Sequence, residues 1–293
     1  MARLTQRKVS VNGVDCPVLE GGPAGSEGSE EAVVFVHGNP GSGRDWTDLA
    51  AQVAPFARVL APDMPGFGRA AKPRDFNYTV EGYAIHLSAL LHQLGIRRVH
   101  LVLHDFGGPW GIVWGTLEPY HLASITLCNT GLLPGYRWHV MGRLWRTPVV
   151  GELLLATQTR PAFRLAMRLA NPRGLPREMV DRMYDEMDAG TKHAIRRLYR
   201  ATGDPGGPMN TVASSLLRPL DLPALVVWGA RDPYIPVRYA EIQRETFRRA
   251  KVAVLPDSGH WPFADNPQAV AGLVVPFLRE QIEPQRSDRP AAA

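Results

Sequence analysis

Asp105 stands at a position from which a carboxylate could act as a nucleophile. Residues 99–111 read VHLVLHDFGGPWG, so an apolar, strand-like run leads into a glycine-rich turn that carries Asp105, and small residues follow. This strand–turn–helix pattern is typical of the sharp turn that exposes a catalytic nucleophile. A carboxylate there can attack a carbon atom and form an ester with the protein. The residue type therefore favours alkyl transfer over the cleavage of peptides or esters.

Two more residues with suitable side chains follow apolar runs later in the chain. Asp232 comes just after the run 225–228, and His260 comes just after the run 251–255. A histidine that is oriented by an acid can act as a general base toward water. Each residue alone is a weak signal, because an aspartate after a strand is often a helix cap. The order nucleophile, acid, histidine, with each residue at a strand end, predicts one catalytic site.

The segment 36–41, VHGNPG, is a further feature that directly follows an apolar run. In folds with this order of catalytic residues, such a loop supplies one backbone N–H of an oxyanion hole, and the residue after the nucleophile supplies the other. We therefore expect the N–H groups of Asn39 and Phe106 to be the two donors. We interpret the later loop 62–69, PDMPGFGR, as a structural turn.

With these motifs, the chain resembles the α/β-hydrolase superfamily from the loop at 37–41 to His260. More narrowly, it resembles the branch with an aspartate nucleophile: epoxide hydrolases, haloalkane dehalogenases and fluoroacetate dehalogenases. The resemblance implies a helical cap, no cofactor and a covalent alkyl-enzyme ester on Asp105. His260, oriented by Asp232, would activate the water that hydrolyses this ester.

Within that branch, residues 197–201, RLYRA, resemble the epoxide-hydrolase segment in which a cap tyrosine is followed by arginine. The resemblance implies that Tyr199 donates a proton to the oxygen of an apolar epoxide as its ring opens to a vicinal diol. A second donor stays open, because residues 150–159 contain no tyrosine. Tyr136, His139, Gln158 or Tyr184 could be that donor. The candidates for substrate contacts are Tyr136, Trp138, His139 and Tyr184.

A haloalkane dehalogenase is the first alternative. These enzymes usually hold the halide with a tryptophan right after the nucleophile, where this chain has Phe106, whose ring has no N–H group. Asn39 matches their second donor, residues 129–132 resemble one dehalogenase subgroup, and Trp138 or Trp145 could replace the missing donor. A binding or isomerising homologue that forms no ester is another alternative. Because Phe106 and Trp110 stand where fluoroacetate dehalogenases place arginine, we expect an apolar substrate.

The elements that must position these residues alternate between strands and helices. Apolar runs at 32–36, 59–61, 99–103, 124–127, 225–228 and 251–255 predict strands, and the segments 78–94, 109–117, 236–250 and 267–281 predict helices. Such alternation predicts an α/β fold with a mostly parallel sheet between helices. From 132 to 220 we expect only helices, at 142–156, 160–170, 176–189 and 192–201. We interpret this stretch as a cap between two parts of the core, 1–131 and 221–283.

The remaining features indicate an ordinary soluble protein. The chain has 293 residues, 45% hydrophobic residues and a net charge of +5 spread along the sequence, with no nucleic-acid-binding signature. No membrane span or signal peptide is expected, so we predict a cytoplasmic monomer or homodimer. Residues 20–31 predict a flexible hairpin loop, and 284–293 a disordered tail. We expect no metal site, since His86, His92, His100 and His121 show no ligand spacing.

Overall fold

The computed structural model describes residues 4–283, so the expected disordered tail at 284–293 lies outside the described residues. Its centre is an eight-stranded sheet in the order β1-β2-β4-β3-β5-β6-β7-β8. The pairs β1–β2 and β2–β4 are antiparallel and the other pairs are parallel. The α/β fold class and all six expected strands are confirmed. The strands are β1 (Thr5–Val11), β2 (Val14–Gly21), β3 (Glu31–Val36), β4 (Val59–Pro62), β5 (Arg98–His104), β6 (Leu122–Cys128), β7 (Ala224–Gly229) and β8 (Lys251–Leu255).

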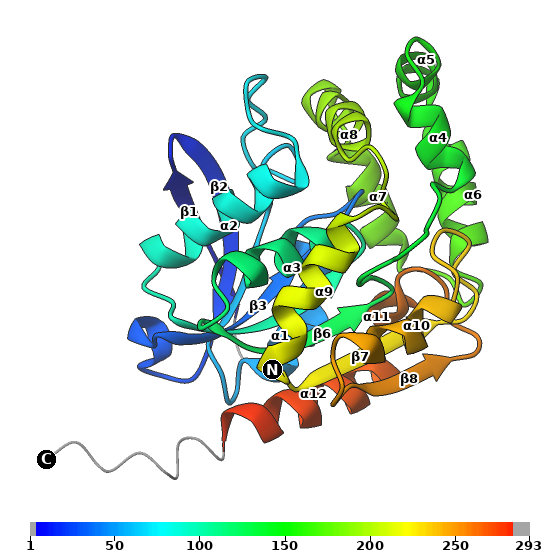
Figure 1. Ribbon diagram of the computed structural model, residues 1–293. Helices are drawn as coiled ribbons and strands as arrows, with labels where there is room; N and C mark the ends of the chain where they lie inside the picture. Colours follow the sequence, from blue (N-terminus) through cyan, green and yellow to red (C-terminus); the bar gives the residue numbers. More distant parts are fainter. Residues whose placement is uncertain (1–3, 284–293) are drawn as a thin grey trace, which may run out of the picture.

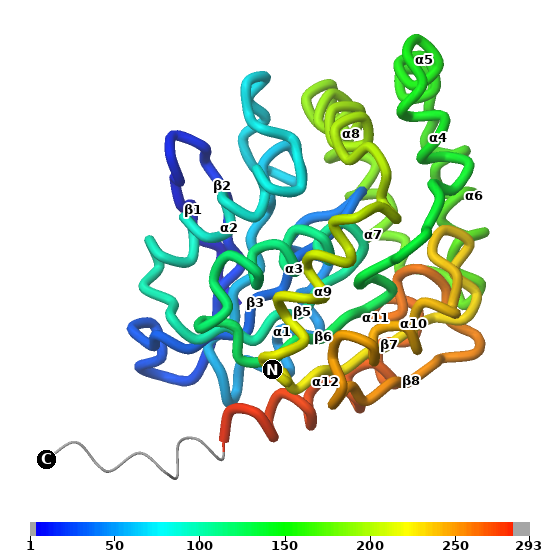
Figure 2. The backbone as a smooth tube through the Cα atoms, viewed as in Figure 1, coloured from blue at the N-terminus to red at the C-terminus, as the bar shows by residue number. Residues whose placement is uncertain are grey.

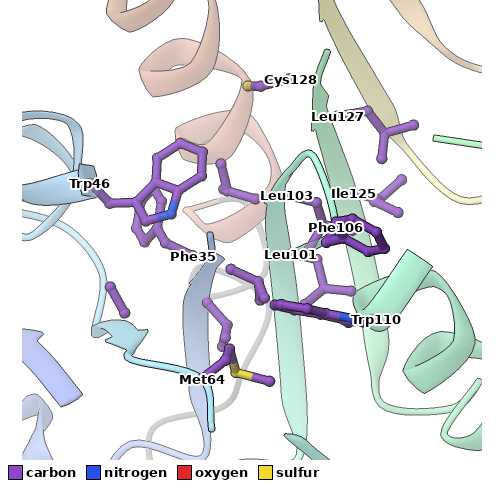
Figure 3. Close-up of a cluster of buried hydrophobic side chains, with 14 of the residues drawn as sticks. Phe35, Trp46, Met64, Leu101, Leu103, Phe106, Trp110, Ile125, Leu127 and Cys128 are labelled. Atoms are coloured by element: carbon purple, nitrogen blue, oxygen red, sulfur yellow. The ribbon is translucent and has the colours of Figure 1, made fainter. Parts of the chain in front are cut away.

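The central strand β5 is covered on both faces, which explains its nearly continuous apolar sequence. Successive side chains of a strand point to opposite faces. Leu103 packs against Gly111 of α3 (Gly107–Leu117) on one face. His104 packs against Trp46 and Phe263 on the other. Figure 3 shows part of this core, with Trp46 and Trp110 near Leu103.

The helices form a layer on each side of the sheet (Figure 1). The helices α1 (Thr47–Val53) and α12 (Pro267–Ile282) pack together on one side, with the short α11 (Pro262–Asp265). On the other side, α2 (Val80–Gln93) packs against α3. Within residues 4–283, none of the helices combines the length and the apolar character needed to span a bilayer.

The segment between β6 and β7, which we call the insertion (residues 132–220), folds into helices only. They are α4 (Val140–Arg146), α5 (Val150–Thr157), α6 (Arg160–Ala170), α7 (Arg177–Asp185), α8 (Ala189–Ala201) and α9 (Met209–Leu217), with a 3-10 turn at Arg218–Leu220. Figure 1 shows α4, α5 and α8 standing above the sheet. The last helix, α9, runs beside α3 of the core, as both Figure 1 and Figure 2 show.

Two expected helices are wrong in extent, and α1, α9 and α11 were not expected. The expected helix at 142–156 is interrupted between α4 and α5, because Pro148 disfavours a helical residue before it and Val149 has φ of 67°. The expected helix at 236–250 ends early, as α10 (Arg238–Ile242) followed by a 3-10 turn at Gln243–Glu245.

The expectation of a hairpin at residues 20–31 is also wrong. The strands on either side of this loop, β2 and β3, are not neighbours, because β4 lies between them. The loop instead contains a 3-10 turn at Ser26–Gly28 and crosses over the end of β4. The sequence could not show that β2 and β3 are separated in the sheet, because the strand between them, β4, comes later in the chain, after α1.

Ion pairs tie the insertion to the core beneath it. Arg182 of α7 lies 2.5 Å from the carboxylate of Asp45, whose side chain is buried. Arg44 pairs with Glu186, and Lys72 lies 3.2 Å from Asp188 at the start of α8. Because Asp45 is buried, the loss of its partner would leave a charge uncompensated. These contacts hold α7 and α8 over the carboxyl ends of the strands.

The packing of β5 on α3 predicts that Leu103→Ala lowers the free energy of unfolding by about 2–5 kcal/mol, because it leaves a cavity in a closely packed core. Urea denaturation measures this change. The matched control is Ile85→Ala on α2, where the side chain is 57% exposed, and it should change stability by no more than about 0.5 kcal/mol. Equal losses in both variants would contradict the packing described here.

Candidate active site

Asp105 occupies a strained turn between β5 and α3. Its φ of 49° lies in the left-handed region, which non-glycine residues rarely adopt. The turn has no room for side chains beside it: a Cβ atom on Gly38 would lie 2.3 Å from the Asp105 side chain, and one on Gly107 would lie 2.2 Å from the Val36 carbonyl oxygen. The glycines of the sequence motif therefore allow two loops to meet closely around the Asp105 carboxylate.

Three of the residues expected to act together are in contact. The Asp105 Oδ2 atom lies 3.3 Å from His260 Nε2, and His260 Nδ1 lies 2.7 Å from Asp232 Oδ2. The Asn39 backbone N–H donates to Asp105 Oδ1 over 2.7 Å. Each residue follows the carboxyl end of a strand, where ligands bind in sheets of this kind. The three residues, which are far apart in the sequence, therefore form a chain of hydrogen bonds that runs from Asp105 through His260 to Asp232.

The electrostatics of this chain favour an ion pair. Burial opposes the charge of Asp105, but the hydrogen bond and the charge of His260, together with the Asn39 N–H, lower the pKa of Asp105 to about 2. Burial likewise opposes the charge of His260. The charge of Asp232 and the hydrogen bonds with Asp105 and Asp232 nevertheless raise the pKa of His260 to about 10. Both shifts act in the same direction and favour an ionised Asp105 beside a protonated His260.

Asp232 is held by a set of donors that the sequence interpretation missed. Its Oδ1 accepts the backbone N–H groups of Tyr234 (2.7 Å) and Ile235 (3.0 Å). Its Oδ2 accepts a hydrogen bond from Asn129 Nδ2 over 2.7 Å. Asn129 follows β6 with φ of 46°, and its Oδ1 in turn accepts the Gly229 N–H. The position of Asn129 directly after a strand was the signal that could have identified it.

Tyr199 reaches the same site from α8. Its side chain is buried, and its hydroxyl oxygen lies 3.4 Å from Asn39 Nδ2. Its ring packs edge-on against Phe106 and lies beside Trp138. Phe106 opens α3, where the first N–H groups of a helix have no intrahelical partner. The Asn39 N–H contacts Asp105 directly, whereas the role of the Phe106 N–H as second donor stays a prediction.

Two cavities meet at Asp105. The larger, about 240 Å³, extends over the start of α3 toward α9, and its lining is mostly apolar. The smaller, about 80 Å³, lies beneath α6 and reaches His260 and Asn39. Four residues line both cavities: Asp105, His139, Tyr199 and Tyr234. A small apolar molecule could therefore lie against the Asp105 carboxylate on either side.

The other predicted substrate contacts divide into two groups. Tyr136, Trp138 and His139 line the larger cavity, and each has a polar side-chain atom that is hydrogen-bonded to the protein. The Tyr136 hydroxyl donates to the Tyr234 carbonyl oxygen over 3.0 Å, and Trp138 Nε1 donates to the Gly203 carbonyl oxygen over 3.1 Å. His139 Nδ1 accepts the Gly142 N–H and caps α4.

Tyr184 lies elsewhere. It lines neither cavity, and its hydroxyl donates to the Gln158 carbonyl oxygen over 3.1 Å. Gln158 itself lines the smaller cavity, as does Trp145. The expectation of a substrate contact at Tyr184 does not fit this placement, because its ring packs on Phe163 inside the insertion.

Tyr234 is a candidate that the sequence interpretation did not name. It follows Asp232 by two positions, its ring centroid lies 4.9 Å from that of His260, and it lines both cavities. Burial raises the pKa of Tyr234 to about 12, so the phenol keeps its proton. The N–H that binds Asp232 fixes this residue beside His260.

The expectation of no metal site stays a prediction, but the fold brings together histidines that show no ligand spacing in the sequence. His92, Glu118 and His121 lie together on the surface, with one ligand atom of each within 4.8 Å of the others. Their sequence spacing hides this arrangement, because His92 belongs to α2 whereas the other two flank the loop after α3.

Comparison with known proteins assigns the fold to a family. Residues 31–267 match the family model described as the alpha/beta hydrolase fold. A cis-3-alkyl-4-alkyloxetan-2-one decarboxylase from Xanthomonas campestris is 28% identical over 94% of this chain and 96% of its own. A haloalkane dehalogenase from Mesorhizobium japonicum is 28% identical over 90% of this chain and 89% of its own. The solved structure of the epoxide hydrolase CorEH superposes with a TM-score of 0.79 and 17% identity, over 97% of this chain and 100% of that one, which shows a shared fold.

The raised pKa of His260 predicts a specific dependence of stability on pH. Protonated His260 is stabilised in the folded state, so its contribution is fully present below pH 6.5 and is lost as the pH rises through about 10. Urea unfolding between pH 6.5 and 10 should therefore show a steeper loss of stability in the wild type than in His260→Gln, which cannot titrate. Parallel profiles for the two proteins would contradict the ion pair.

Proposed function

The chain belongs to the α/β-hydrolase fold family, and we propose that it opens apolar epoxides to vicinal diols through an ester on Asp105. The observation that supports this proposal most directly is the Tyr199 hydroxyl. It is buried at the junction of the two cavities, beside the carboxylate and within 3.4 Å of the Asn39 amide. Burial raises the pKa of Tyr199, with a further contribution from the Asp105 charge, so this phenol is protonated and able to donate.

In the first half-reaction, an oxygen of Asp105 attacks a ring carbon and the carbon–oxygen bond of the epoxide breaks. The developing alkoxide takes the proton of Tyr199, which is general-acid assistance. Asp105 Oδ2 is the attacking atom, because Oδ1 accepts the Asn39 N–H over 2.7 Å, whereas Oδ2 has only the longer contact of 3.3 Å with His260 Nε2. The product is a hydroxyalkyl ester. Its carbonyl oxygen, Oδ1, stays within hydrogen-bond distance of the Asn39 N–H.

In the second half-reaction, water attacks the ester carbonyl carbon and gives one proton to His260. Esterification removes the Asp105 charge, one of the causes of the raised pKa of His260, so the imidazolium releases its proton to solvent and becomes the neutral base that this step needs. The oxyanion on Oδ1 is stabilised by the N–H groups of Asn39 and Phe106. When the intermediate collapses, the departing diol oxygen takes the proton that His260 received from water. The proton left on Asp105 then returns to Tyr199, and His260 regains a proton from solvent beside the restored carboxylate.

A haloalkane dehalogenase is the second candidate, because the Asn39 amide reaches the smaller cavity, where a leaving halide could be bound. Of the two expected replacements for the halide-binding tryptophan, Trp138 has its N–H bound to the Gly203 carbonyl oxygen, whereas Trp145 lines the smaller cavity together with Asn39. The two relatives described above are named for a haloalkane and for an oxetanone. Haloalkanes, oxetanones and epoxides all present a carbon bonded to a leaving atom, so the experiments below compare all three.

Trapping of the ester tests the covalent step. Intact-protein mass spectrometry of His260→Gln should show an adduct of the whole mass of styrene oxide, because Asp105 still attacks while water is no longer activated. A butyl adduct from 1-bromobutane alone would favour the dehalogenase. Release of an alkene from a cis-3,4-dialkyloxetan-2-one, without either adduct, would favour the activity of the decarboxylase relative. Asp105→Asn should form no adduct with any of them.

Tyr199→Phe separates ring opening from halide displacement. Loss of the proton donor should slow ester formation from styrene oxide by about 10²–10⁴-fold, while ester formation from 1-bromobutane should change far less, since a halide leaves without a proton. Rapid-quench mass spectrometry in the His260→Gln background gives both rates. The matched control is Tyr184→Phe, which lies outside both cavities. An unchanged epoxide rate in Tyr199→Phe would remove the basis of the proposal.

A further inference from the structure

His92, Glu118 and His121 form a compact cluster on the side of the molecule where α2 and α3 end. The Glu118 carboxylate lies between the two imidazoles: Oε1 is 3.3 Å from His92 Nε2, and Oε2 is 3.4 Å from His121 Nδ1. The imidazole centroids are 5.9 Å apart. We propose that these three side chains bind a divalent transition-metal ion of the zinc type, with the remaining coordination position open to solvent.

The distances support this assignment. Zinc binds imidazole nitrogen and carboxylate oxygen at about 2.0–2.2 Å in tetrahedral sites, which places neighbouring ligand atoms about 3.3–3.4 Å apart. Each imidazole nitrogen lies at about that edge length from one oxygen of Glu118, His92 Nε2 from Oε1 and His121 Nδ1 from Oε2. One ligand atom of each of the three residues lies within 4.8 Å of the other two, so the three side chains can reach a common ion. Two imidazoles and one carboxylate suit zinc better than magnesium or calcium, which prefer oxygen ligands.

Hydrogen bonds from neighbouring groups also hold the cluster in place. Ser88 lies one turn before His92 on α2, and its hydroxyl donates to Glu118 Oε1 over 2.7 Å. Both backbone polar groups of His121 are hydrogen-bonded. Its N–H donates to the Glu118 carbonyl oxygen, and its carbonyl oxygen accepts the Val99 N–H. Hydrogen bonds to ligating carboxylates of this kind orient them for a metal.

The electrostatic surroundings favour a cation as well. His92 lies in the last turn of α2, and Glu118 is the C-cap of α3, so the carbonyl ends of two helices face this region. Such ends carry partial negative charge. The side chains of His92, Glu118 and His121 are 54%, 22% and 32% exposed, so an ion can enter from solvent without a change of fold.

This site is separate from the proposed chemistry. The helix α3 has 11 residues and begins beside Asp105, so its far end lies about 16 Å along the helix axis from that turn. A bound ion would link the end of α3 to α2 and to the start of β6. We therefore expect it to stabilise the fold and to leave epoxide opening unchanged.

Isothermal titration of untagged, chelator-treated protein with ZnCl₂ tests the proposal. We expect one equivalent to bind to the wild type, with affinity reduced at least about tenfold in the double variant His92→Gln/His121→Gln and about 10–100-fold in Ser88→Ala. The control His193→Gln removes a half-buried histidine outside the cluster and should bind like the wild type. Co²⁺ should give the intense visible absorption of a tetrahedral site in the wild type and not in the double variant.

The thermal unfolding midpoint supplies the second measurement. Zn²⁺ should raise it in the wild type and in His193→Gln, and should leave it unchanged in the double variant. Without metal, all proteins should unfold alike, which shows that the variants are folded. Equal Zn²⁺ affinity in the wild type and the double variant, or no binding to the wild type, would overturn the proposal, whatever the outcome for Asp105 and its substrates.

Discussion

A buried carboxylate that must stay ionised determines how this part of the molecule is built. Asp105 stands in a left-handed turn with its oxygens pointed at an N–H group and an imidazole. Burial alone would raise its pKa, so each compensating group has to lie within hydrogen-bond distance. That closeness leaves no room for a side chain at Gly38, whose Cβ would meet the Asp105 carboxylate. Gly107 is needed for a different reason, because the Val36 carbonyl oxygen lies against it.

The second carboxylate, Asp232, is supported in a different way. It is the fully buried partner of His260 and accepts two backbone N–H groups as well as the Asn129 amide. These neutral donors stabilise its charge without supplying a competing positive charge. His260 is consequently the cation shared by two anions, and its raised pKa follows from that sharing. Loss of the Asp105 charge on ester formation would then change the protonation of His260, which couples the two half-reactions.

The sequence predicts the features that depend on strand ends. Asp105, Asp232 and His260 could be identified because parallel strands deliver their following loops to one edge of the sheet. Asn129 was missed although it also follows a strand, because an asparagine carries no catalytic signal by itself. The hairpin expected at 20–31 is wrong since pairing of β2 with β4 depends on a strand that comes later in the chain. The engaged polar atoms of Tyr136 and Trp138 depend on how the insertion folds back, which residue order does not reveal.

The cluster of His92, Glu118 and His121 is another feature that could not be predicted from the sequence, because it depends on contacts between separate elements. Only the packing of α2 on α3 brings His92 to the other two, so no local spacing could predict the group. The helix α3 connects the two places: its first turn supports Asp105 and its last residue is followed by Glu118. Because helices are stiff along their axis, an ion at the far end would restrain the packing of α3 against α2 without reaching the reacting atoms. The two proposals therefore place stabilisation by an ion and the chemistry of Asp105 at opposite ends of one helix, where each can be altered separately.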